Sequence, residues 1–514
     1  MLTRRARHGS VRSSHVVPRA LVVALALLAG CDADEPSAPK VFESATVEMC
    51  QVTGAAPVLV LVPASEVAAR RQRGDYVTRL LVDPSKPQQA DSIHFQRLTD
   101  ALEVARSGRV ARRELASAAC RITIVAASGT LGGSVVGSSD PTKERFPFLI
   151  DVPDITIRGA LQVQQDEDGI AQTPGDGAAT TRIEPSPALA VIGAVGGQPG
   201  LSQPIFVVNG SPDNSGGGHR AIIEGFSLTS GHAFGDTTVG GQGVLALRVR
   251  GLMVRGNHFT GNFTERIDLR ASDGAVFGNI SSGTGNSCDF CLAGPGNYTA
   301  FGNRLVGGGI PGIYVSPTVV LPVPSGVDQY ALPSEAEVYA TILNNYVGDH
   351  LRRPVGAGLR LSAIGVGAPN VKGLVRASLT DNVLVNNTFG ILVEAGFPVA
   401  GSLLRGDIQA EIGGNEISGS CQAPLLVSFS RHTTGLGLNN LPYLQNSTYT
   451  LAIAGLAAWE QQAWYAHARD RGNTLLVNNG TVAPGNRSAY DATGCPRFGT
   501  ARMSELGDHA LPRP

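Results

Sequence analysis

The chain has 514 residues, a formal net charge of −1 and a pI near 6.8, so its overall charge does not indicate a nucleic acid or an anionic membrane surface as partner. Its 64 glycines, its aromatic content of 5% and its lack of long helical periodicity favour one repetitive body over two or three separate compact domains.

Residues 1–30 have the layout of a secretion signal. Several arginines fall within residues 4–19, and an apolar run follows at 20–29. This run is too short to span a bilayer, because a transmembrane helix needs roughly 20 apolar residues. The run ends in Leu-Leu-Ala-Gly before Cys31, which resembles the lipobox of bacterial lipoproteins.

The lipobox resemblance implies cleavage before Cys31, attachment of lipid to its thiol, and export. Residues 31–40 would then be a tether, because they are rich in Asp, Pro and Ser. The expected location is the cell membrane or the outer membrane, with the body in the periplasm or at the surface. An ordinary signal peptide followed by a chance cysteine is the alternative.

The remaining cysteines are even in number, which suits disulfides in an oxidising compartment. Proximity along the chain predicts the pairs Cys50–Cys120, Cys288–Cys291 and Cys421–Cys495. The Cys-Asp-Phe-Cys segment at 288–291 also has the spacing of a redox or zinc-binding pair, but no second pair at ligand spacing accompanies it. No metal site is therefore predicted.

Residues 41–145 are expected to cap the N-terminal end of the body. Apolar residues at helical intervals over 92–102 predict a helix that can cover the open end of a core, and 121–126 has the pattern of a strand. Residues 147–159, which end in Asp-Ile-Thr-Ile-Arg-Gly, then supply the first strands of the body.

The body itself, expected over residues 146–430, repeats a Gly-Asn corner between two short apolar segments. Asn257, Asn279 and Asn303 are spaced 22 and 24 residues apart, and looser copies follow around Asn344, Asn382 and Asn415. Two or more short strands per period predict a coil of stacked parallel strands, with the asparagines of successive corners hydrogen-bonded to one another. A leucine-rich repeat is the alternative, but the second half of each period has a strand pattern and not a helical one.

The order of capping helix, strand and Asp-Ile-Thr-Ile-Arg-Gly phrase resembles the pectate-lyase-like superfamily over roughly residues 90–430. The resemblance implies an all-β fold, a right-handed parallel β-helix (a single-stranded solenoid) with an N-terminal capping helix and a C-terminal cap. It leaves the function open, because that superfamily includes lyases, hydrolases, epimerases, adhesins and scaffolds.

Residues 431–514 are expected to form the C-terminal cap that the end of a solenoid requires. A helix is predicted over 456–471, which contains Trp459, Trp464 and Tyr465, and a strand over 473–477.

Alternation within the strands predicts one charged outer face. If Ile267 and Leu269 point inward, then Arg266, Asp268 and Arg270 point outward. One coil earlier, with a period of 22, Leu245, Leu247 and Val249 would point inward, which places Arg248 over Arg270 and leaves Arg250 outside. Further outward positions are expected at Asp289, Tyr314, Arg360 and Glu394. A stripe of arginines interleaved with acids suits an acidic polysaccharide, since guanidinium groups pair bidentately with carboxylates and sulfates. The alternative is a solvated face, in which these arginines and acids only keep the sheet soluble.

A polysaccharide lyase is the alternative function. Arg270 or Lys372 would then be the base, and Asp268 or Asp289 a calcium ligand. The catalytic motifs of the superfamily's polygalacturonases and alginate epimerases are absent, and no other cofactor motif occurs. A lipid-anchored, non-catalytic carbohydrate-binding or structural rod is therefore the preferred prediction, without a cofactor, and with calcium only if the chain is a lyase.

Overall fold

The structure is a computed structural model that describes residues 46–52, 57–87, 89, 93–110, 120–133, 143–185, 204–210, 217–230, 241–283, 285, 287–308, 311–317, 335–351, 356–364, 372–396, 405–429, 444–455, 463–466, 472–480 and 486–489. The chain divides into two units, Met1–Ser44 and Ala45–Pro514, and all of the elements below belong to the second. Cys31 and Cys495 lie outside the described residues. Within them, no helix is long and apolar enough to cross a membrane.

A small antiparallel sheet begins the second unit. Its strands are β1 (Thr46–Gln51), β2 (Val58–Pro63) and β3 (Tyr76–Val77), in the order β2-β1-β3. The short helices η1 (Ala64–Glu66) and α2 (Val67–Gln72) connect β2 to β3.

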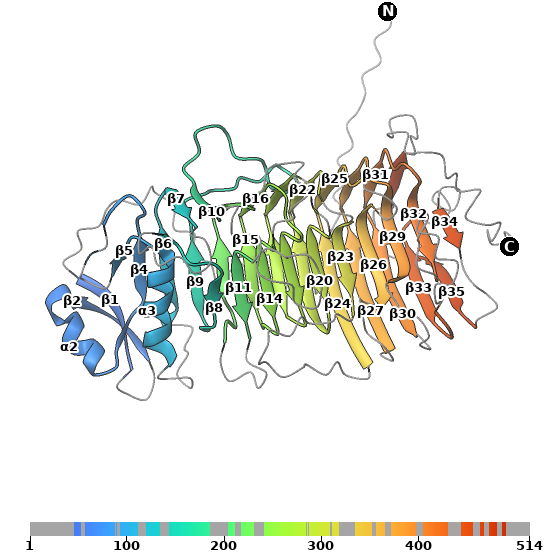
Figure 1. Cartoon of the computed structure of the whole chain (residues 1–514). Coiled ribbons are helices and arrows are strands. Elements are labelled where there is room, and N and C mark those ends of the chain that lie inside the picture. The colour runs from blue at the N-terminus through green and yellow to red at the C-terminus, as the bar shows by residue number, and fades with distance from the viewer. Residues whose placement is uncertain are drawn as a thin grey trace, which may run out of the picture. The chain divides into compact units, whose positions relative to one another are not determined.

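Three long parallel sheets form the body. The chain passes from sheet 1 to sheet 2 to sheet 3 and then returns to sheet 1 one strand further along (Figure 1). Sheet 1 contains β4 (Arg79–Val82), β5 (His94–Phe95), β6 (Ile122–Ala126), β9 (Ile155–Arg158), β12 (Ile222–Glu224), β15 (Leu252–Arg255), β18 (Gly274–Phe277), β21 (Gly296–Phe301), β24 (Glu335–Leu343), β27 (Lys372–Thr380), β30 (Gly406–Gly413), β33 (Thr448–Ile453) and β35 (Thr474–Asn479).

Sheet 2 contains β7 (Gly129–Gly132), β10 (Thr181–Glu184), β13 (Phe226–Thr229), β16 (His258–Thr260), β19 (Ile280–Ser282), β22 (Arg304–Val306), β25 (Tyr346–Gly348), β28 (Val383–Val385), β31 (Glu416–Ser418) and β36 (Arg487–Ala489). Sheet 3 contains β8 (Phe148–Ile150), β11 (Phe206–Asn209), β14 (Val244–Leu247), β17 (Ile267–Arg270), β20 (Phe290–Ala293), β23 (Pro311–Ser316), β26 (Ala357–Ile364), β29 (Phe389–Gly396), β32 (Ala423–Ser428) and β34 (Ala463–Ala466).

The fold is a right-handed parallel β-helix, as predicted. Both halves of each coil are strands, which excludes the leucine-rich repeat. Alternate residues of all three sheets point inward and form one continuous hydrophobic core. Burial of this column of aliphatic side chains is the main stabilising contribution, at about 25 cal/mol per Å² of apolar surface.

The predicted capping helix is α3 (Leu98–Val110), but the predicted range 92–102 is wrong at His94–Phe95, which form β5 of sheet 1. Leu98, Ala101, Leu102 and Ala105 are buried and belong to the main core, at the spacing of one helix face. The carboxylate of Glu144 accepts hydrogen bonds from the amides of Leu98 (2.6 Å) and Thr99 (3.0 Å) and from the Thr99 hydroxyl (2.6 Å). These bonds satisfy amides of the first helical turn, which have no partner within the helix.

The predicted asparagine stack forms between sheets 1 and 2. The Nδ2 of Asn257 donates to Oδ1 of Asn279, and that of Asn279 to Oδ1 of Asn303, both at 3.1 Å. The same bond continues, at 2.8–3.0 Å, through Asn345, Asn382, Asn415 and Asn486. The asparagine that joins the stack in this coil is Asn345, so the expected position at Asn344 is wrong by one residue. Asn344 instead occupies the left-handed position (φ 57°) that Gly256, Gly278 and Gly302 hold in earlier coils.

Two of the predicted disulfides form. Cys50–Cys120 links β1 to a residue two positions before β6, and Cys288–Cys291 lies at the start of β20. Cys421 is disulfide-bonded as well, and its predicted partner Cys495 lies outside the described residues.

At the C-terminal end, the predicted helix over 456–471 is wrong at Ala463–Ala466, which form β34 and pair in parallel with β32. Pairing with an existing sheet outweighs the weak local helical pattern there. The predicted strand is confirmed as β35, and the parallel sheets continue past residue 430 to β36.

Candidate functional site on the outer face of sheet 3

The outer face of sheet 3 carries the polar side chains that the sequence singled out. The inward residues of β17 are Ile267 and Leu269, both in the main core, so Asp268 and Arg270 point outward. The register then places Cys291 beside Asp268, Tyr314 beside Cys291, and Arg360 beside Tyr314.

The predicted stack of Arg248 over Arg270 is wrong. In β14 the inward residues are Val244 and Ala246, and Leu247 is the residue that pairs with Arg270. A shift of one residue exchanges the two faces of a strand. Arg248 lies in the turn after β14 with a left-handed backbone (φ 56°), and Arg250 is exposed in the same turn.

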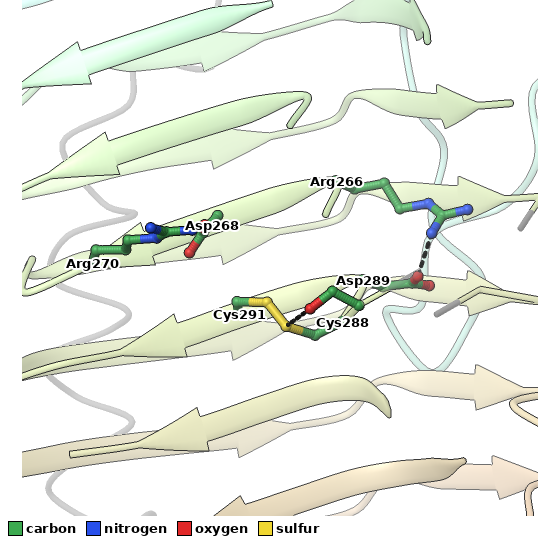
Figure 2. Close-up of a disulfide and its surroundings, with 7 residues drawn as sticks. Arg266, Asp268, Arg270, Cys288, Asp289 and Cys291 are labelled. Carbon is green, nitrogen blue, oxygen red and sulfur yellow. Dashed lines mark hydrogen bonds and ion pairs between the residues drawn. A yellow bond between two sulfur atoms is a disulfide. The ribbon is translucent and has the colours of Figure 1, made fainter. Parts of the chain in front are cut away.

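Arg266 also departs from its predicted outward position. It is fully buried, and its Nη1 donates to Oδ1 of Asp289 at 2.5 Å, away from Asp268 and Arg270 (Figure 2). Asp289 is buried too, and its Oδ2 accepts from the hydroxyl of Ser281 (3.1 Å) and lies 3.3 Å from Nε2 of His350. Burial lowers the pKa of Arg266, although Asp289 favours its charged form. Arg266 and Asp289 are therefore part of a closed ion pair and are unavailable to a ligand.

Asp268 and Arg270 form an ion pair on the outer face (Figure 2). The Nε and Nη2 of Arg270 lie 2.7 and 2.5 Å from Oδ2 of Asp268, so both contacts use the same carboxylate oxygen. The side chain of Arg270 is 15% exposed and that of Asp268 is 3% exposed. Although burial disfavours the charged form, the charge of Asp268 and its hydrogen bond raise the pKa of Arg270, which makes Arg270 a poor base.

Glu265, which precedes β17, is the residue that sequence reasoning missed. It is 8% exposed, hydrogen-bonds to the side chains of Ser287 and Gln242, and has a buried Oε2 without a hydrogen-bond partner. Burial, and then the charge of Asp268, raise the pKa of Glu265 to about 8. No sequence signal marks it, because its neutral form results from burial in the folded chain.

Tyr314 lies two strands from Asp268, about 10 Å along the coil axis. It packs against the Cys288–Cys291 disulfide, is 7% exposed, and its hydroxyl is buried without a hydrogen-bond partner. The guanidinium carbon of Arg360 lies 5.3 Å from the centre of its ring. Arg360 in turn forms a buried ion pair with Glu394.

Lys372 is not part of this cluster. It begins β27 in sheet 1, where its Nζ lies 3.5 Å from Oε1 of Glu335. The structure therefore does not bring it together with Asp268 and Arg270, as the predicted lyase site would require. Among the described residues, no group of three or more His, Cys, Asp or Glu side chains is arranged to hold a metal ion.

No protein-family model and no curated protein matches this chain. Among solved structures it is similar to DFA-IIIase from Arthrobacter chlorophenolicus A6 without its lid, with 12% identity and a TM-score of 0.36 over 80% of this chain and 94% of that chain. It is also similar to the tailspike gp49 of Acinetobacter baumannii bacteriophage Fri1, a capsular polysaccharide depolymerase. The identity is 11% and the TM-score is 0.29, over 88% of this chain and 70% of that chain.

A third similar structure is the A-module of the Azotobacter vinelandii mannuronan C-5 epimerase AlgE6, with 16% identity and a TM-score of 0.28 over 78% of this chain and 94% of that chain. Similarities this low carry no argument about the function of this chain, which must come from the site itself.

Proposed function

We propose that the outer face of sheet 3 binds a carbohydrate at a site formed by Glu265, Asp268, Arg270 and Tyr314. One observation carries the proposal: in the described part of the chain, Oε2 of Glu265 and the hydroxyl of Tyr314 are both buried without a hydrogen-bond partner. Buried polar atoms nearly always have partners, so these two unpaired atoms support a ligand that supplies partners for them. A hydroxyl-rich ligand fits, because each hydroxyl both donates and accepts.

The charge balance of the site favours a neutral glycan over the acidic one expected from sequence. Arg270 is paired with Asp268, Arg360 with Glu394, and the buried Arg266 with Asp289. Because each of these three arginines already pairs with a carboxylate of the protein, none of them is left to neutralise a carboxylate or sulfate on a ligand. An acidic glycan would have to break an existing pair, which leaves a poorly solvated carboxylate behind.

The test is calorimetric titration of the purified chain with neutral oligosaccharides of the fructan, glucan, mannan and xylan types, and with oligogalacturonate as the acidic probe. Tyr314→Phe removes the unpaired hydroxyl and should weaken binding about tenfold, the value of roughly one hydrogen bond. The matched control is Tyr339→Phe on sheet 1, where the tyrosine is 44% exposed. An equal loss of affinity in both variants, or binding of oligogalacturonate alone, would contradict the proposed site.

The expected lipid anchor at Cys31 is a second part of the proposal. Its support is the arginine-rich segment, the apolar run at 20–29 and the cysteine that ends it. Export would place the carbohydrate site in the periplasm or at the cell surface. Cys31→Ser should move the protein from the membrane fraction to the soluble fraction of an expressing bacterium, and an unchanged distribution would exclude the anchor.

A further inference from the structure

We propose that two copies of this chain dimerise through strand β2, which pairs antiparallel with β2 of the second copy about a two-fold axis at Val60. The strand belongs to the small antiparallel sheet at the N-terminal end of the body, and not to the three parallel sheets (Figure 1). The inference does not depend on the proposed carbohydrate binding. If both hold, the dimer joins two carbohydrate sites in one particle, which strengthens binding to a polymeric glycan.

Strand β2 is the outer strand of its sheet. The order is β2-β1-β3, and no strand in the described part of the chain pairs with the other side of β2. Such an unpaired edge is a template for another strand, and proteins usually protect it with charged residues. β2 has no charged residue over its six positions. Its side chains are instead apolar and exposed, by 55% at Val58, 45% at Leu59 and 72% at Leu61.

The pairing within the sheet shows which backbone groups of β2 are directed to its free edge. The carbonyl of Glu48 in β1 accepts a hydrogen bond (3.1 Å) from the amide that follows β3, so the backbone groups of Glu48 point to β3. Because these groups alternate along a strand, those of Met49 point to β2, where Met49 pairs with Val60. The amide and carbonyl of Val60 therefore point to β1, and those of Leu59 and Leu61 point to the free edge.

The sequence of this strand matches it to itself. From Pro57 to Pro63 it is Pro-Val-Leu-Val-Leu-Val-Pro, which reads the same in both directions. In an antiparallel pair centred on Val60, Leu59 therefore lies opposite Leu61 of the second copy. The two leucine pairs exchange four hydrogen bonds in all and gather four leucine side chains on one face. The prolines take the next edge-facing positions and have no N–H, so they end the pairing on both sides.

This symmetry favours a second copy over a different protein, because a two-fold interface requires a surface that is complementary to itself. Charge permits the contact. Glu48 lies beside Leu61 in β1, and its two copies would be at least three strand spacings apart, about 14 Å. This distance exceeds the Debye length of about 8 Å at physiological ionic strength. The strand alone buries less than the about 800 Å² per partner of a stable interface, so the dimer should dissociate on dilution.

Sedimentation velocity of the full chain, from about 1 µM to about 1 mM, tests the association. The expected result is a reversible equilibrium of monomer and dimer without larger species, because a two-fold interface is closed. Leu61→Lys should raise the dissociation constant at least about tenfold, since it places a charge at both leucine contacts. The matched control is Leu476→Lys on β35, the outer strand of sheet 1, where the leucine is 48% exposed. This variant should dimerise like the wild type.

Cysteine cross-linking tests the register. The two-fold axis places Val60 opposite its own copy in a non-hydrogen-bonded pair, with Cα atoms about 4.5 Å apart, which suits a disulfide. Val60→Cys should therefore form covalent dimers under mild oxidation. Val58 faces Val62 of the second copy, so its two copies lie four residues apart along the strand, about 14 Å. Val58→Cys should cross-link no more than the wild type, which contains cysteines of its own.

Three results would each overturn the inference: a wild type that is monomeric at every concentration, an equal loss of association in Leu61→Lys and Leu476→Lys, or equal cross-linking by Val60→Cys and Val58→Cys. A monomeric wild type whose binding to phosphatidylglycerol vesicles is lost in Leu61→Lys would assign the strand to a lipid surface instead. Calorimetry of Leu61→Lys with the oligosaccharide panel tests the carbohydrate site separately, because Leu61 lies outside that site.

Discussion

Replacement of Asn279 tests the stack that holds successive coils in register. The Nδ2 of Asn279 donates to the carbonyl of Val254 (2.8 Å) and to Oδ1 of Asn303 (3.1 Å), while its Oδ1 accepts from the amide and from Nδ2 of Asn257, both at 3.1 Å. All three asparagines are fully buried. Asn279→Ala removes these four bonds where water does not replace them.

The expected cost is about 2 to 5 kcal/mol. In the variant, Oδ1 of Asn303 still accepts a hydrogen bond from the backbone amide of residue 279, and Nδ2 of Asn257 still donates to the carbonyl of Ile223. The groups that lose their hydrogen-bond partner are therefore mainly the amide of Asn257 and the carbonyl of Val254. A buried group left without its partner costs about 1 to 3 kcal/mol. Asn279→Asp should cost more, because it places a carboxylate oxygen against two acceptors.

Amide hydrogen exchange is the appropriate assay, since a solenoid need not unfold in one step. In Asn279→Ala, protection over residues 252–282 should fall by roughly 30- to 3,000-fold, the equivalent of that free energy. The control Asn297→Ala, on an exposed asparagine bonded to Asp273, should change protection by less than about fivefold. Unchanged protection in Asn279→Ala would refute the idea that the stack stabilises the coils.

Three other predictions concern single residues. Glu144→Ala should destabilise α3 by about 1 to 3 kcal/mol, because its carboxylate accepts the first amides of that helix, and exchange of those amides should be faster in the variant. The raised pKa of Glu265 means that its neutral form stabilises the folded chain fully below pH 4.5, and that this stabilisation is lost as the pH rises to about 8. In denaturant titrations, the wild type should therefore lose up to about 5 kcal/mol of unfolding free energy over that interval, relative to Glu265→Gln. A difference between the two proteins that stays constant with pH would contradict the raised pKa. Gly308→Ala should cost about 1 to 3 kcal/mol, measured the same way, because a Cβ there would lie 2.0 Å from Oδ2 of Asp289; a neutral result would mean that Asp289 is free to move.

Much of the fold was predictable because it depends on local rules that repeat. A Gly-Asn pair at each corner supplies a left-handed residue followed by a buried asparagine, and the same pair recurs at Asn257, Asn279 and Asn303. The capping helix was predictable for the same reason, since its buried residues follow helical spacing. The corner at Asn345 was missed by one residue because Asn344 is itself able to adopt the left-handed conformation.

The site was less predictable because the faces of β14 cannot be distinguished by hydrophobicity. Its sequence, Val-Leu-Ala-Leu, is apolar at every position, so alternation does not show which residues point inward. The turn after β14 is also one residue longer than the turn after β17, which changes the register relative to a fixed period of 22. The predicted outward direction of the Arg266 side chain was wrong because the chain bends before β17, and the alternation of side chains along a strand does not extend through a bend.

The protonation of Glu265 at pH 7 is the property of the proposed carbohydrate site that a single measurement tests most directly. Infrared difference spectra of the wild type against Glu265→Gln, recorded from pH 6 to pH 10, detect the stretching band of a protonated carboxyl group. The band should be present at pH 6 and 7 and disappear with a midpoint at a pKa of about 8. Its absence at pH 6 would show that Glu265 is ionised, and the raised pKa of this buried carboxyl group would then be wrong.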